Sequence, residues 1–217
     1  MRVTRPLAGK GLIAYGGMDL SSHLDLTSFA AAIPYEKKIH TDVYAWVPEE
    51  AFEVRETANR DRFRMWRDLG WLTVHPGPVI DYDLLLADLL EIKTKYRLQG
   101  CAFDPWGLES PAQTLTKCGF KIIDFRQGEK SISPAVKDFE AVVYSKRLKH
   151  YGNPVLAWAL ENVRMEKGAA GGMKPSKRHS TGKIDPLIAT MMAVALAEKS
   201  KHGPKKSVYS SRGMIMG

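Results

Sequence analysis

The sequence of 217 residues predicts an α/β fold in which helices cover both faces of one central mixed sheet. Two early runs, residues 12–18 and 27–33, are rich in the small, β-branched and aromatic residues that are typical of strands. A third run, residues 39–47, alternates in polarity and follows after a short connection. Short connections favour antiparallel neighbours, so the first three strands are predicted to be antiparallel. Beyond residue 48, helical and strand patterns alternate before the chain ends in helices.

Capping residues place the helices. Pro48 and the two acids after it open a helix that is predicted to reach residue 69, where Gly70 ends it. Further helices are predicted at residues 81–96, 112–118, 133–148, 153–162 and 185–199, and short strands at 100–103 and 121–125. The Gly-, Lys- and Ser-rich residues 168–180 predict a flexible or hairpin-like insertion. We expect a linker remnant at 1–13, one domain at 14–199 and a flexible basic tail at 200–217.

Composition narrows the class of protein. The formal net charge of +8 favours a polyanionic partner, although part of it comes from the tail, which has no acidic residue after Glu198. No apolar run approaches the roughly 20 residues of a membrane span. Cys101 and Cys118 form no metal-type spacing, which favours a reducing compartment.

Three aspartates are the candidate site. Asp19 and Asp104 end apolar runs, and Asp185 stands just before the last helix. If the three carboxylates converge, their mutual repulsion requires divalent cations, for which carboxylate oxygens are suitable ligands. A pair of ions about 3.5–4 Å apart activates water and stabilises the leaving oxygen of a phosphodiester, with Asp19 as the bridging ligand. The pattern therefore points to a magnesium- or manganese-dependent enzyme acting on phosphate esters.

Local alternatives exist for each aspartate. Asp185 precedes a proline at a helix start and suits an N-cap, Asp104 can begin a turn, and Asp19 can form an Asx-turn. Other catalytic schemes have no visible residues, because the chain contains neither a Gly-x-x-x-x-Gly-Lys-Ser/Thr loop nor a Gly-x-Ser-x-Gly elbow.

Several short motifs follow one another along the chain. They include Gly16-Gly17-Met18-Asp19, Phe103-Asp104, Arg126-Gln127-Gly128, Asn153-Pro154 and Lys183-Ile184-Asp185-Pro186. In this order they resemble the C-terminal nuclease domain of tailed-bacteriophage terminase large subunits, and the resemblance covers residues 16–198.

The resemblance implies a ribonuclease H-like fold and a hydrolase that cuts concatemers of double-stranded viral DNA during genome packaging. It implies two Mg²⁺ or Mn²⁺ ions, with Asp19, Asp104 and Asp185 as metal-binding and catalytic residues. Lys177, Arg178 and Lys183 are candidate contacts for DNA phosphates.

Partners follow from the same resemblance. Members of the family carry an ATPase motor with Walker motifs, which this sequence lacks, so it resembles the isolated nuclease domain. The implied partners are double-stranded DNA, the ATPase motor domain, the small terminase subunit and the portal, in the host cell cytoplasm and outside the mature virion. Two other functions stay open: a non-catalytic DNA-binding or docking module, and another ribonuclease H-like nuclease such as a ribonuclease or a junction resolvase.

Overall fold

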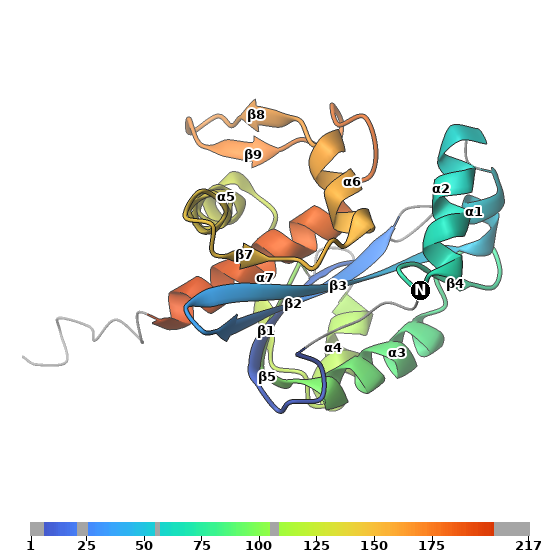
Figure 1. Cartoon of the computed structure of the whole chain (residues 1–217), viewed down its shortest axis with the longest axis horizontal. Coiled ribbons are helices and arrows are strands. Elements are labelled where there is room, and N and C mark those ends of the chain that lie inside the picture. The colour runs from blue at the N-terminus through green and yellow to red at the C-terminus, as the bar shows by residue number, and fades with distance from the viewer. Residues whose placement is uncertain (1–6, 21–25, 55–56, 105–108, 202–217) are drawn as a thin grey trace, which may run out of the picture.

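The computed structural model describes residues 7–20, 26–54, 57–104 and 109–201, and it shows one central sheet between two layers of helices (Figure 1). The sheet has the order β4-β3-β2-β1-β5-β6, with β7 also paired to β3. Its strands are β1 (Ile13–Asp19), β2 (Thr27–Tyr35), β3 (Lys38–Pro48), β4 (Thr73–His75), β5 (Arg97–Phe103), β6 (Ile122–Asp124) and β7 (Leu148–Lys149). The predicted mixed sheet is confirmed.

The first three strands form the predicted antiparallel meander. Glu36 and Lys37 connect β2 to β3 with φ angles of 47° and 61°, the left-handed conformation that a two-residue hairpin turn requires. The remaining pairs, β1–β5, β5–β6, β3–β4 and β3–β7, are parallel. Parallel strands bring their carboxyl ends to one edge of the sheet, which is the edge that matters for the candidate site.

Helices cover both faces of the sheet, as predicted. On one face lie α5 (Glu129–Tyr144), α6 (Pro154–Asn162) and α7 (Asp185–Lys201), and on the other lie α3 (Tyr82–Lys95) and α4 (Glu109–Lys117) (Figure 1). The hydrophobic cores on the two faces are separate sets of buried residues: α3 packs through Leu85, Leu89 and Ile92, whereas Leu187 and Val194 of α7 belong to the opposite core. Within the described residues, we find no helix with the length and apolar character needed to cross a membrane.

Side-chain caps begin two of the predicted helices. Asp81 accepts hydrogen bonds from the backbone N–H groups of Asp83 and Leu84 at the start of α3. Asn153 accepts from those of Val155 and Leu156 at the start of α6, and its side-chain amide donates to the Val43 carbonyl of β3. Asn153 therefore fixes both the start of α6 and its position on the sheet.

Other boundaries differ from the prediction. The helix expected to reach residue 69 is seen as α1 (Glu49–Val54) and α2 (Thr57–Asp68), and residues 55–56 between them lie outside the described residues. Helix α5 begins at Glu129 rather than at 133, because Gly128 takes the extended cap conformation and Pro134 is accommodated inside the helix. The same helix ends at Tyr144, so Leu148 belongs to β7 and not to a helix. Residues 21–25, between the first two predicted strands, lie outside the described residues.

The insertion at 168–180, which was predicted to be either flexible or hairpin-like, contains the turn and second strand of a hairpin. Strand β8 (Met165–Lys167) pairs antiparallel with β9 (Met173–Pro175), apart from the main sheet (Figure 1). The Gly168 N–H donates to the Gly172 carbonyl at 2.7 Å and closes the turn, in which Gly171 has a φ of 84°. The segment that leaves β9 leads directly to α7 and carries Lys177.

Candidate active site

Asp19 and Asp104 leave neighbouring strands at the same edge of the sheet. Strands β1 and β5 are parallel, and Met18 pairs with Phe103 at their carboxyl ends. Asp19 is the last residue of β1, and Asp104 directly follows β5. The sequence placed both residues at strand ends, and the parallel pairing makes those ends adjacent.

Asp185 reaches the same region from the start of α7. The backbone N–H groups of Leu187 and Ile188 both donate to the Ile184 carbonyl, so Ile184 precedes the helix and Asp185 is its first residue. The interpretation of Asp185 as the N-cap was wrong. Asp185 lies in the first turn with its side chain only 6% exposed, and its carboxylate faces Lys177.

Lys177 joins Asp19 to Asp185. Its Nζ lies 2.8 Å from Asp19 Oδ2, 3.1 Å from Asp19 Oδ1 and 3.0 Å from Asp185 Oδ1. The lysine side chain is 50% exposed, whereas that of Asp19 is 4% exposed. The ammonium group of a half-exposed side chain therefore lies against two buried carboxylates from different elements.

Gln127 joins Asp19 to Asp104. Its side-chain Nε2 donates to Asp19 Oδ1 at 2.9 Å, and its backbone N–H donates to Asp104 Oδ2 at 2.8 Å. The three predicted aspartates are thus connected in the order Asp185–Lys177–Asp19–Gln127–Asp104. The structure brings all three into one connected group through two residues that lie between them.

The electrostatics of this group follow from its burial. The pKa of Asp19 is raised to about 7, mainly by burial and also by the negative charge of Asp185, while the ammonium of Lys177 and the hydrogen bond from Gln127 oppose the rise. Desolvation lowers the pKa of Lys177, but the two carboxylates outweigh it and hold that pKa above its ordinary value. Two carboxylates therefore share one positive charge, and Asp19 is short of the positive charge it needs to ionise fully at neutral pH.

The donor set suits a hard divalent cation, although its carboxylates are not gathered tightly. In the part of the chain that the structure describes, no group of three or more His, Cys, Asp or Glu side chains lies close enough to hold a metal ion. Asp19 Oδ2 is nevertheless a buried oxygen with no hydrogen bond among the described residues, and only the ion pair with Lys177 compensates it. Asp19 and Asp185 share the single positive charge of Lys177, and Asp19 Oδ2 has no hydrogen-bond donor among the described residues. Carboxylate oxygens of this kind are suitable ligands for a divalent ion.

The other candidate basic residues lie nearby. Arg178 and Lys183 belong to the segment between Lys177 and Asp185, with Arg178 exposed and Lys183 partly buried. Their role as phosphate contacts stays a prediction. For Lys177, the structure adds a role that the sequence did not reveal, because its ammonium faces two of the predicted metal ligands.

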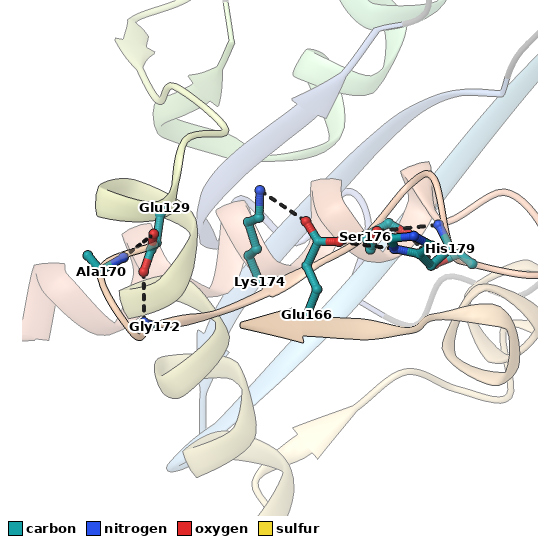
Figure 2. A network of polar contacts seen from close by, with 8 residues as sticks. Glu129, Glu166, Ala170, Gly172, Lys174, Ser176 and His179 are labelled. Atoms are coloured by element: carbon teal, nitrogen blue, oxygen red, sulfur yellow. Dashed lines mark hydrogen bonds and ion pairs between the residues drawn. The ribbon is translucent and has the colours of Figure 1, made fainter. Parts of the chain in front are cut away.

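A second polar network holds the segment that carries Lys177. Figure 2 shows the Glu129 carboxylate of α5 accepting from the backbone N–H groups of Ala170 and Gly172, at 3.0 and 2.7 Å, in the turn of the β8–β9 hairpin. The Glu166 carboxylate of β8 contacts Lys174 and His179 at 3.0 and 3.2 Å. Hydrogen bonding from Ser176 is the largest of the causes that lower the pKa of Glu166 to about 2, and these two contacts add to it. The hairpin is thus fastened at its turn and at the start of the loop after it.

The turn contact leads to a prediction about local order. Replacing Glu129 by alanine removes the acceptors of the Ala170 and Gly172 N–H groups, so we expect the amides of residues 168–172 to exchange with deuterium about tenfold faster. Hydrogen-exchange mass spectrometry measures this. Glu140→Ala, an exposed position on the same helix, is the matched control and leaves the turn protected. Equal exchange in both variants would contradict the anchoring role.

Comparison with known proteins identifies the chain. The family model for the terminase large subunit, endonuclease domain, matches residues 2–201. The chain belongs to this family. It is 33% identical over 187 residues to the large terminase subunit of Enterobacteria phage HK97, which covers 84% of the chain and 37% of the relative. It is 29% identical over 190 residues to protein YmfN of Escherichia coli K12, with 82% of the chain and 42% of that protein covered. The chain therefore spans well under half the length of these curated relatives.

Solved terminase structures share the fold. The crystal structure of the HK97 large terminase superposes with a TM-score of 0.79 at 30% identity, over 90% of the chain and 40% of that protein. The large terminase nuclease from thermophilic phage G20c, solved with bound magnesium, superposes with a TM-score of 0.59 at 13% identity, over 89% of the chain and 84% of that nuclease. These matches confirm the predicted ribonuclease H-like fold.

Proposed function

We propose that this terminase endonuclease domain hydrolyses phosphodiester bonds of double-stranded DNA with divalent cations bound by Asp19, Asp104 and Asp185, and that it cuts concatemers during genome packaging. The observation that carries the proposal is the connected group of three aspartates at one sheet edge, in which Asp19 and Asp185 share the ammonium group of Lys177. The magnesium-bound G20c nuclease supports a divalent ion as the metal. Double-stranded DNA and an ATPase motor domain are the proposed partners, together with the small terminase subunit and the portal.

Each residue has a distinct part in this proposal. Asp19, Asp104 and Asp185 would hold the cations, and Asp19 is the carboxylate connected to both of the others, through Lys177 and Gln127. Mg²⁺ or Mn²⁺ ions there would activate the attacking water and stabilise the leaving oxygen. Lys177 balances part of the carboxylate charge, and its side chain is half exposed.

The test is cleavage of supercoiled plasmid DNA by the purified chain. We expect nicking and linearisation with Mn²⁺ or Mg²⁺ and none with excess EDTA. Asp104→Asn keeps the shape of the side chain but removes its charge, so we expect the rate to fall at least about a hundredfold, the usual cost of losing one electrostatic contact at a reacting centre. Asp124→Asn is the matched control, because Asp124 is exposed and pairs with Phe103 on the neighbouring strand end.

Two alternative functions predict different results in the same assay. A DNA-binding or docking module binds DNA in a salt-sensitive manner and cuts nothing with any metal. A ribonuclease or junction resolvase prefers an RNA–DNA hybrid or a four-way junction over linear duplex when all three substrates are compared. The double-stranded endonuclease is rejected if metal-dependent cutting of the duplex is absent or survives unchanged in Asp104→Asn.

A further inference from the structure

The backbone of Gln127 is held by hydrogen bonds of the residues before it and after it in the sequence. Before it, the Phe125 N–H donates to the Phe103 carbonyl at 2.9 Å and extends the β5–β6 pairing past Asp124, with Phe125 itself buried. After it, the Gly128 carbonyl accepts from the N–H groups at the start of α5. Gln127 therefore lies in a short connection between a strand pairing and a helix, with little freedom in its backbone.

This fixed residue contacts two aspartates with two different groups. The backbone N–H donates to Asp104 Oδ2, and the side-chain amide donates to Asp19 Oδ1. Asp19 and Asp104 stand at the ends of the neighbouring strands β1 and β5. Gln127 follows the next strand, β6, and orients both carboxylates from there. Gln127 itself is only partly buried.

The Gln127 amide and the Lys177 ammonium, which both contact Asp19, differ in their chemistry. Lys177 brings a positive charge that offsets the carboxylate, whereas a glutamine amide donates a hydrogen bond and leaves the negative charge in place. A neutral donor on one oxygen orients a carboxylate while preserving its attraction for a cation. Removing a donor that hydrogen-bonds a metal ligand typically changes metal affinity by about 10–100-fold.

We infer that Gln127 is a positioning residue of the metal centre, holding Asp19 and Asp104 in the orientation that binds divalent cations. The inference rests on the proposed function. It assigns to Gln127 no contact with DNA or with the reacting atoms. Its effect is exerted through the two carboxylates.

The experiment measures Mn²⁺ binding to the whole chain in the absence of DNA, by isothermal titration calorimetry. Gln127→Met has a similar length and no side-chain donor, and it keeps the backbone N–H that serves Asp104. Gln127→Asn keeps the amide but withdraws it by one methylene. The matched control is Gln113→Met, at an exposed position on α4. Thermal unfolding of every variant in EDTA provides the readout for folding.

We expect both Gln127 variants to bind Mn²⁺ at least about tenfold more weakly than the wild type, with the control unchanged. Unfolding temperatures in EDTA stay the same, and the metal concentration for half-maximal cutting rises more than the rate at saturating metal falls. Wild-type affinity in both variants overturns the inference, and so does weaker binding that merely follows lost thermal stability. A wild-type chain that binds no Mn²⁺ and cuts no DNA instead overturns the proposed function, and the inference with it.

Discussion

Asp19→Asn is expected to lose nuclease activity by about a thousandfold or more, the largest effect of any single substitution in this site. Asp19 contacts both residues that connect the group, Lys177 and Gln127, and it lies between the other two aspartates. Asparagine has the same shape but no charge, so it is a poor ligand for Mg²⁺ or Mn²⁺. Plasmid cleavage at saturating Mn²⁺ measures the loss, and Asp124→Asn is again the matched control.

The same substitution is also expected to change how the stability of the fold depends on pH. The pKa of Asp19 is about 7, above its ordinary value of 3.8. Between these two pH values the folded wild type binds more protons than the unfolded chain, so its stability falls as the pH rises from about 4 to about 7. The asparagine side chain of the variant cannot titrate, so the variant is expected to lack this contribution. Melting temperatures measured in EDTA across that range would contradict the account if the two proteins changed in parallel.

Much of the fold was predictable because its signals are local. The alternating strands, the amphipathic stripe of α3 and the Asn153 cap each depend on a few consecutive residues, and all are present. The start of α5 was not predicted, because Gly128 provides no side-chain cap and Pro134 suggested a later start. Short β7 was missed for a related reason, since two residues carry no periodicity and their pairing with β3 is tertiary.

The site was predictable in its carboxylates but not in the residues between them. Strand ends and a helix start marked the positions of Asp19, Asp104 and Asp185 along the chain. The ion pair of Lys177 with Asp19 spans 158 positions in sequence, and the Gln127 contact with Asp19 spans 108. No local pattern encodes such contacts. The hairpin and the β6–α5 connection bring these residues to the sheet edge, so only the three-dimensional structure reveals them.

The close approach of α7 to β1 leads to the largest expected effect on stability. A Cβ atom on Gly17 would lie 2.1 Å from the Ala189 carbonyl oxygen and 2.7 Å from the Ala193 nitrogen, both in the backbone of α7. A helix backbone cannot move aside as a flexible side chain does. Gly17→Ala is therefore expected to destabilise the fold by about 3 kcal/mol, the upper part of the usual range for overpacking. This corresponds to a fall in melting temperature of roughly 10 °C for a chain of this size.

The substitution also tests how the site is assembled, because Gly17 lies two residues before Asp19 and contacts the helix that begins at Asp185. Pushing α7 away from β1 separates the two carboxylates that share Lys177, so we expect Gly17→Ala to lose Mn²⁺-dependent cleavage even at temperatures where it remains folded. Gly128→Ala is the matched control, since a Cβ there meets nothing within 4 Å and the φ of −71° suits alanine. Its cost is expected to stay below about 1 kcal/mol. Wild-type stability and cleavage in Gly17→Ala would show that the contact between β1 and α7 does not set the spacing of Asp19 and Asp185.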